Sequence, residues 1–220
     1  MADAIVLNNE FLDGIIKDNL KERRIIINGE INEDLVEYAM IWILKWNRED
    51  AELPLTPTSR KPIEILLNTP GGNVSEGFAL CNIIENSVTP VHITTLGMAA
   101  SMGAYIAMSG TKGERKCYEF STFLIHSGSM VVGGNSNDVE STVKYYTDTK
   151  ADIEQFIYKH TNITKELYKE HQKDEWYITS RLSDTISCGK SCFIRSFDDN
   201  NLVIESRIRR ACGKFSDIIS

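Results

Sequence analysis

The sequence predicts an α/β fold in which most strands are parallel. Short apolar runs with the length of buried strands alternate with longer segments whose apolar residues recur at helical spacing. Glycine, proline and asparagine residues separate the two kinds of segment, as turns require. This alternation is typical of parallel sheets with helices on their faces, and ligands bind to such sheets beyond the carboxyl ends of the strands.

The first half of the chain contains most of this alternation. Continuous apolar runs predict strands, which we place at residues 24–29, 63–68 and 91–96. Apolar residues at helical spacing predict helices, which we place at residues 6–22, 32–46 and 75–87. Between residues 47 and 62 the chain is polar and carries three prolines, so we expect a loop there.

The second half begins with a glycine turn and a helix of small residues, expected at 97–109. A fourth strand is expected at 120–125, and the glycines of residues 128–137 predict a loop. From residue 138 to about residue 159, the apolar spacing predicts a long helix with little apolar sequence around it. Such a helix usually packs on a partner, so we expect the chain to form an oligomer.

Length and composition are those of a single soluble globular domain. The 220 residues suffice for one core, and the hydrophobic content of 42% and charged content of 25% are ordinary. The net charge of −7 argues against nucleic acid as a partner. Polar residues interrupt the longest apolar stretch, so we expect no membrane span.

The N-terminus and the cysteines favour a cytoplasmic protein. No basic segment followed by an apolar core opens the chain, so we expect no signal peptide. The five cysteines are an odd number, which favours reduced thiols. Cys188 and Cys192 are four residues apart, but no second pair or nearby histidine completes a zinc site, so we expect no bound metal.

Three groups in the sequence together point to acyl transfer. Ser101 begins the helix of small residues, His126 follows the fourth strand, and Gly71 and Gly72 form a turn after the second strand. A serine hydroxyl needs a base to take its proton, and imidazole suits that role near neutral pH. The charge that develops on a substrate carbonyl needs N–H donors, which a glycine turn can bring close. Since all three groups follow strands, they should face one cleft, and the sequence predicts a serine peptidase.

The residues alone leave parts of this site open. His92, His160 and His171 are alternative bases, although His92 lies within a strand and the other two lie in polar stretches. A third member should be a carboxylate that orients the imidazole, and composition cannot choose it from 31 acidic residues. The Gly-x-Ser-x-Gly motif is absent, which argues against the α/β-hydrolases.

Three motifs carry a resemblance to a known family. They are Asn-Thr-Pro-Gly-Gly at residues 68–72, Gly-Met-Ala-Ala-Ser-Met-Gly-Ala at 97–104, and Ile-His at 125–126. In this order, with 29 residues from Gly72 to Ser101, the chain closely resembles the proteolytic subunit of the Clp protease. The resemblance covers roughly residues 20–180.

The resemblance implies a crotonase-like, ClpP-type fold of repeated ββα units with a protruding handle helix. It also implies a Ser-His-Asp triad, in which Ser101 matches the nucleophile and His126 the general base. Asp174 matches the aspartate, because one residue separates it from an aromatic residue as in the family. The amides of Gly72 and Met102 match the two donors of the oxyanion hole.

The same resemblance implies one peptidase domain over residues 1–220. Residues 138–178 would form the handle and the segment after it. Similarity to the family is lost near residue 179, so residues 180–220 form a divergent tail.

The resemblance further implies a serine endopeptidase that acts as a homo-oligomer. In the family, two seven-membered rings stack and enclose the active sites, and an AAA+ unfoldase feeds unfolded polypeptides into the chamber. This chain has no Walker motif, so ATP would be used by that partner, and we expect no cofactor in the chain itself.

Two departures from the family leave alternatives open. Ser127 and Gly128 stand where Gln-Pro is usual, which bears on cleavage preference. The divergent tail keeps open a catalytically weak or inactive subunit that only builds rings. A crotonase-type acyl-CoA hydratase or isomerase is a further alternative, because it shares the fold and the two-amide oxyanion hole, although such enzymes usually rely on glutamates.

Overall fold

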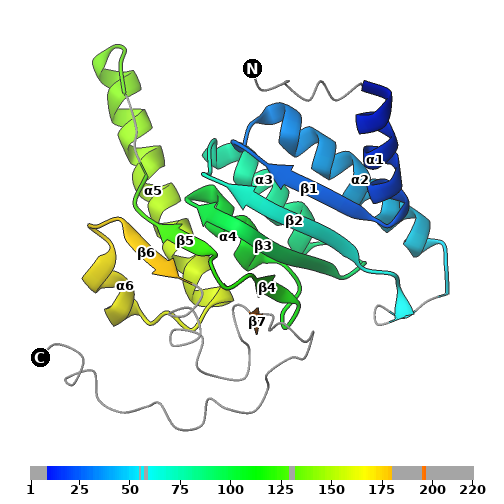
Figure 1. The fold of residues 1–220 in the computed structure, drawn as a ribbon. Coiled ribbons are helices and arrows are strands. Elements are labelled where there is room, and N and C mark those ends of the chain that lie inside the picture. Colours follow the sequence, from blue (N-terminus) through cyan, green and yellow to red (C-terminus); the bar gives the residue numbers. More distant parts are fainter. Residues whose placement is uncertain (1–8, 55, 57–58, 129–131, 180–194, 197–220) are drawn as a thin grey trace, which may run out of the picture.

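The computed structural model describes residues 9–54, 56, 59–128, 132–179 and 195–196 (Figure 1). The strands are β1 (Arg24–Asn28), β2 (Ile63–Thr69), β3 (Val91–Ala100), β4 (Arg115–Cys117), β5 (Thr122–Ile125), β6 (Trp176–Thr179) and β7 (Arg195–Ser196). The helices are α1 (Asn9–Lys21), α2 (Glu33–Ala51), α3 (Val74–Glu85), α4 (Met102–Ser109), α5 (Ser136–His160) and α6 (Lys165–His171). The described part of the chain is an α/β structure, as the sequence predicts.

The sheet is parallel along its main path, which runs in the order β1-β2-β3-β4-β7. β5 also pairs with β3 in parallel, beyond the point where β4 leaves it, and β6 pairs with β5 in the antiparallel direction. The turns after β2 and β3 and the residue after β5 therefore lie at the same edge of the sheet. This edge is the one that the sequence predicts for the site.

The core lies between the sheet and the helices α2, α3 and α4 (Figure 1). Every second residue of β2 is buried, including Ile63, Ile65 and Leu67. All residues of α4 are buried, which explains why that helix consists of small and apolar residues. The opposite face of the sheet exposes apolar side chains such as Leu96 and Met98.

Asparagine side chains cap the N-termini of three of the described helices. The side-chain oxygen of Asn32 accepts a hydrogen bond from the Leu35 N–H at 3.0 Å, which begins α2. Asn73 and Asn135 cap the first turns of α3 and α5 in the same way. Because Asn73 directly follows the glycine turn, its cap fixes the point where the turn becomes helix.

Two boundaries differ from the sequence-based expectation. The predicted third strand ends at residue 96, but β3 continues to Ala100, and α4 begins only at Met102. The segment that looked like a turn and helix is partly strand because β5 pairs with it, Ala100 opposite Leu124. Helix α2 continues beyond residue 46 to Ala51, because buried Asp50 in its last turn is bound by Arg23 at 2.7 and 2.8 Å. The other predicted elements of the first half are confirmed with ends shifted by a few residues, whereas β4, α6 and β6 were not predicted.

Helix α5 is the long helix that the sequence predicts, and it projects from the body (Figure 1). Ile157 is its one buried residue, and the partly buried Ile153 and Phe156 pack against the core beside it. The first half of the helix exposes large side chains such as Val143 and Tyr145. The helix is therefore held by its C-terminal part. No helix among the described residues has both the length and the apolar character needed to cross a membrane.

Candidate active site

Ser101 occupies a strained turn between β3 and α4. Its backbone has φ 52° and ψ −124°, a region that residues with a side chain rarely adopt and that costs about 1–3 kcal/mol. Two hydrogen bonds of 2.9 Å hold this conformation, one from the Ser101 N–H to the Leu124 carbonyl and one from the Ala104 N–H to the Ser101 carbonyl. The hydroxyl does not cap the helix that follows. The strain thus presents a hydroxyl at the carboxyl end of the sheet.

The glycine turn packs directly against this serine. Gly71 has φ 95°, and a Cβ added to it would lie 2.7 Å from the Cβ of Ser101 and 2.6 Å from the Ala100 carbonyl oxygen. No side chain larger than hydrogen fits there. A Cβ on Gly72 would lie 2.3 Å from the carbonyl oxygen of Ile31. Both glycines are therefore required for the turn to approach Ser101 so closely.

Two backbone N–H groups are available beside the serine. Ile31 donates to the Gly71 carbonyl and accepts from the Asn73 N–H, both at 2.8 Å. The N–H of Gly72 lies between these two bonded groups and takes no part in this parallel bridge. Met102 is the first residue of α4, where helical N–H groups have no partner within the helix. The helix N-terminus also favours negative charge, so these two amides could bind an oxyanion.

His126 follows the last residue of β5, next to the strand that leads to Ser101. The parallel pairing of β3 with β5 sets Ala100 opposite Leu124, which brings the two strand ends together. The Nε2 atom of His126 is buried and has no hydrogen-bond partner among the described residues. A buried imidazole nitrogen without a partner is costly, and such exceptions occur at functional sites. The structure thus brings Ser101, His126 and the glycine turn to one edge of the sheet, as predicted.

Asp174 lies at the same edge, between α6 and β6. Its N–H donates to the His171 carbonyl at 3.0 Å, and its side chain is exposed. The antiparallel pairing sets Trp176 opposite Ile125 and, continued by one residue, sets Glu175 opposite His126. Two neighbouring acidic residues therefore lie at the strand end that carries His126. The sequence singled out only Asp174, and the register of β5 and β6 is the signal that adds Glu175.

Helix α5 contacts the residue after His126. The Tyr146 hydroxyl donates to the Ser127 carbonyl at 2.5 Å, and the Ser127 hydroxyl donates to the Gln172 carbonyl at 3.2 Å. Ser127 thus joins the long helix to the segment that carries Asp174. The sequence identified Ser127 as a departure from the family but gave no sign of these contacts.

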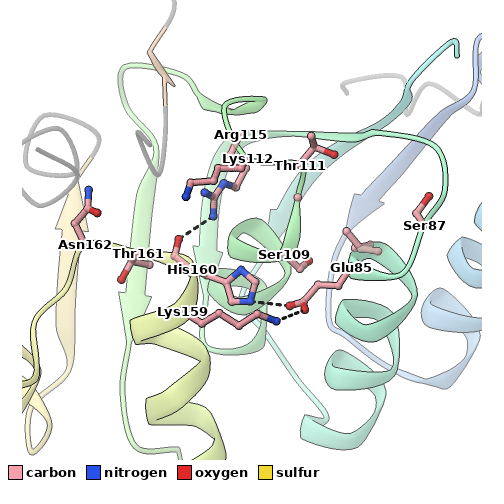
Figure 2. A pocket seen from close by; sticks show the side chains of 12 residues that line it. Glu85, Ser87, Ser109, Thr111, Lys112, Arg115, Lys159, His160, Thr161 and Asn162 are labelled. Carbon is pink, nitrogen blue, oxygen red and sulfur yellow. Dashed lines mark hydrogen bonds and ion pairs between the residues drawn. The ribbon is translucent and has the colours of Figure 1, made fainter. Parts of the chain in front are cut away.

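A cavity of about 430 Å³ lies at the other end of the sheet (Figure 2). Helices α3, α4 and α5 all end beside it, at Glu85, Ser109 and His160. Arg115 donates from one guanidinium nitrogen to the carbonyls of Met108 at 2.7 Å and His160 at 2.9 Å. It therefore binds the terminal carbonyls of two helices, which cations at helix C-termini stabilise.

Glu85 binds two other side chains of this cavity. Glu85 binds Lys159 at 2.7 Å and the His160 imidazole at 2.8 Å (Figure 2). Burial lowers the pKa of His160, and the Glu85 carboxylate opposes this change only in part. The hydroxyls of Ser109 and Thr161 donate to carbonyls of their own helices. These contacts join the ends of α3, α4 and α5, which indicates a structural junction, although the buried Nδ2 atom of Asn162 has no hydrogen-bond partner among the described residues.

The remaining alternatives from the sequence lie elsewhere. His92 is the second residue of β3, at the end of the strand away from Ser101. His160 lies in the cavity, and His171 stacks on Trp176 with ring centroids 4.5 Å apart. Among the described residues, no group of three histidine, cysteine or acidic side chains could hold a metal ion. Cys188 and Cys192 lie outside the described residues.

Comparison with known proteins identifies relatives over most of the chain. The family model described as Clp protease matches residues 8–189. A protein of Bacillus licheniformis called "ATP-dependent Clp protease proteolytic subunit 2" is 31% identical over 159 residues, which are 72% of this chain and 80% of that protein. A protein of the same name from Corynebacterium glutamicum is 28% identical over 166 residues, 75% of this chain and 79% of that protein.

Proposed function

The chain belongs to the Clp protease family, and from this premise we propose how its residues perform the hydrolysis of peptide bonds. The ClpP-type fold and the peptidase activity follow from membership of the family. We propose that Ser101 is the nucleophile, His126 the general base and Asp174 the carboxylate that orients the imidazole. The N–H groups of Gly72 and Met102 form the oxyanion hole.

The reaction follows from these roles. The Nε2 atom of His126 takes the proton from the Ser101 hydroxyl as the oxygen attacks the substrate carbonyl carbon. The amides of Gly72 and Met102 stabilise the oxyanion of the tetrahedral intermediate. His126 then gives its proton to the leaving amine, and the acyl-enzyme forms. Water attacks the acyl group, with His126 again as the base, and releases the second product.

The observation that carries this assignment is the strained backbone of Ser101 against Gly71. A serine with φ 52°, whose Cβ lies 2.7 Å from the place where a Gly71 Cβ would be, requires a glycine turn at that point. The strained Ser101 backbone destabilises the folded state, and its catalytic use explains why it is kept, because it places the hydroxyl beside the two proposed oxyanion donors. Triad chemistry of this kind needs no metal or organic cofactor, so we propose that the chain uses none.

We further propose that the chain works as a homo-oligomer of stacked heptameric rings in the cytoplasm. The projecting helix α5, with exposed Val143 and Tyr145, supports an assembly in which other copies cover it. The relatives are named as proteolytic subunits of an ATP-dependent protease, which supports an ATP-driven AAA+ unfoldase as a partner that delivers unfolded polypeptides. ATP would then be hydrolysed by the partner and not by this chain.

Covalent labelling tests the assignment of the nucleophile. The purified chain is treated with a fluorophosphonate probe, and the modified peptide is identified by mass spectrometry, with Ser101→Ala as the control. We expect one modification, at Ser101, together with hydrolysis of a short fluorogenic peptide. A native mass measurement on the same sample gives the number of subunits.

One observation favours a second candidate. The Nε2 atom of His126 has no partner among the described residues, and the Asp174 side chain is exposed, so the single chain does not show a fully joined triad. A chain that forms rings, takes no label and hydrolyses no peptide would be a structural subunit. Labelling at Ser101 in the assembled protein excludes that role.

A further inference from the structure

We infer that Asn68 is a positioning residue, which uses its side-chain amide to hold the glycine turn and the strand before Ser101 in register for catalysis. Asn68 lies near the end of β2 and precedes the turn of residues 70–72. Its hydrogen bonds go to Asn28, Met98 and Gly29, and not to the Ser101 side chain or to the proposed oxyanion donors. The inference rests on the proposed function, since it concerns the geometry of that site.

The pairing of β2 with β3 is irregular at Asn68. Leu67 is opposite Thr95 and Thr69 is opposite Ala99, so β3 advances by four residues while β2 advances by two. The extra residues of β3 have no regular partners on β2 at this point. Irregularities of this kind redirect a strand and are common beside active sites. Here the irregularity lies just before Ala99 and Ala100, the two residues that lead into Ser101.

The Asn68 side chain replaces the missing ladder contacts. Its Oδ1 atom accepts a hydrogen bond from the Met98 N–H at 2.9 Å, within the irregular part of β3. Its Nδ2 atom donates to Oδ1 of Asn28 on β1 at 2.8 Å. Its backbone carbonyl accepts from the Gly29 N–H at 3.1 Å. One residue therefore joins the ends of β1, β2 and β3.

Each of these contacts leads to a part of the site. Met98 is three residues before Ser101, so the bond to Oδ1 fixes the strand that presents the nucleophile. Gly29 is two residues before Ile31, which binds the Gly71 carbonyl and the Asn73 N–H. Asn68 itself is four residues before Gly72. The strand that leads to the nucleophile and the end of β1 are thus bound by the Asn68 side chain, and the segment before Ile31 is bound by the Asn68 backbone.

Gly97 gives independent support for this role. A Cβ added to Gly97 would lie 2.9 Å from the Oδ1 atom of Asn68, closer than real Cβ contacts allow. The backbone of Gly97 does not have positive φ, so the conformation itself does not require glycine. The space occupied by the Asn68 amide is therefore the steric reason for glycine at this position.

A shift of the β3 end that Asn68 binds should lower the reaction rate more than it lowers the stability of the fold. Misplacement of reacting groups by about 1 Å costs about 100-fold in rate. The bonds of Asn68 lie at the surface, where one lost hydrogen bond changes stability only modestly. The role therefore predicts a fall in kcat that is larger than the loss of thermal stability explains.

The experiment compares Asn68→Ala with a matched variant at the other end of the sheet. The Asn47 side chain also makes two hydrogen bonds, in which its Oδ1 atom accepts from the Ser87 hydroxyl at 2.8 Å and from the Thr89 N–H at 3.2 Å. We measure kcat and KM on a fluorogenic peptide, the melting temperature and the native mass of each protein. We expect Asn68→Ala to lower kcat by about 10- to 100-fold with KM within about twofold, and Asn47→Ala to leave kcat unchanged at a similar loss in melting temperature.

Two further variants separate positioning from folding. Asn68→Asp keeps an oxygen for the Met98 N–H, and Asn28 can rotate its amide to donate to it, so we expect most of the kcat to return. Gly97→Ala pushes the amide away from Met98 and should lower kcat by about tenfold alone, yet add nothing in the Asn68→Ala background. The Gly97→Ala single variant remains readable if Asn68→Ala itself assembles poorly, because it keeps the asparagine, and a wild-type kcat in Gly97→Ala would then contradict the inference.

The outcomes distinguish this inference from the proposed function. A wild-type kcat in Asn68→Ala, or an equal fall in Asn47→Ala, leaves Asn68 a merely structural residue while Ser101 still takes the fluorophosphonate label. Additive losses in the Gly97 cycle also contradict the inference. An unlabelled and inactive wild-type assembly instead overturns the proposed function, and the inference with it.

Discussion

The two ends of the parallel sheet use their polar groups in opposite ways. At the carboxyl end, Ser101 has a strained backbone, His126 has a buried nitrogen without a partner among the described residues, and the Asp174 side chain is exposed. At the amino end, Arg115 and Glu85 each bind two groups across helix ends. The comparison teaches that backbone strain is found at the end of the sheet that carries the candidate site, whereas contacts between helix ends are found at the other end.

The sharpest test of this contrast uses the two serines of the Ser101–α4 segment. Ser101→Ala should reduce peptide hydrolysis by about 10⁴–10⁶-fold, because it removes the nucleophile. Ser109→Ala, at the other end of α4, removes a buried hydroxyl that donates to the Ile106 carbonyl at 2.7 Å and should cost about 1 kcal/mol of stability with kcat unchanged. Steady-state kinetics and thermal unfolding of both variants check this. Substantial activity in Ser101→Ala would contradict the proposed mechanism.

The next largest effect concerns the two carboxylates beside His126. Asp174→Asn should lower kcat by about 10²–10⁴-fold, because a neutral amide no longer stabilises the imidazolium or selects its tautomer. Glu175→Gln should change kcat by less than about threefold, since the Glu175 carboxylate is exposed and accepts from the Tyr177 hydroxyl at 3.1 Å. The measurement is kcat against pH for both. The reverse ranking would assign the orienting role to Glu175.

A third prediction concerns stability far from the site. The Arg23 guanidinium, and to a lesser degree the Thr89 hydroxyl, hold the pKa of the buried Asp50 carboxyl below 3.8. Asp50→Asn removes the closer charge partner of Arg23 and leaves only Glu49 at 3.9 Å, so it should cost about 3 kcal/mol at neutral pH. Denaturant unfolding at several pH values checks this.

The pH dependence of that difference has a definite sign. A carboxyl whose pKa is lowered by folding contributes stability above its unfolded pKa and loses it as pH falls through the folded value. The gap between wild type and Asp50→Asn should therefore be full above about pH 5 and shrink below 3.8. A gap that stays constant down to pH 2 would contradict the lowered pKa.

The smallest effect is expected in the cavity. Burial lowers the pKa of His160 below 6.5, so the unfolded chain binds this proton more readily than the folded chain. Wild type should then lose about 0.5 kcal/mol more than His160→Gln as pH falls from 8 to 5. Glu85→Gln removes the carboxylate that favours the charged imidazole and should deepen the loss. If acidification instead stabilises wild type relative to His160→Gln, the ion pair with Glu85 outweighs burial.

Local patterns were enough to predict most of the fold from the sequence. Buried strands such as β2 are continuous apolar runs, and the long helix α5 shows helical spacing over its length. The end of β3 was missed because the residues before Ser101 are small and resemble a helix, while their strand character comes from pairing with β5. Short elements such as β4 have too few residues for a pattern of their own.

The sequence predicts the catalytic residues of the candidate site but not the residues that position them. Ser101, His126 and the glycine turn each follow a strand, so their meeting at one edge could be inferred from strand order alone. The positions of Asn68 and Glu175 depend on strand register. Asn68 lies opposite the irregular part of β3, and Glu175 follows from the antiparallel pairing of β5 with β6. Register depends on contacts between distant segments, which no local pattern contains.

Helix α5 is fixed to the body at one end only, near its C-terminus. It is anchored near Ile157, and its first residue lies about 30 Å from that anchor at the rise of an α-helix. Between anchor and tip, the Tyr146 hydroxyl grips the Ser127 carbonyl, one residue from His126. A displacement of the N-terminal end of α5, where a neighbouring copy would bind, would therefore be transmitted with smaller amplitude to the residue beside the imidazole.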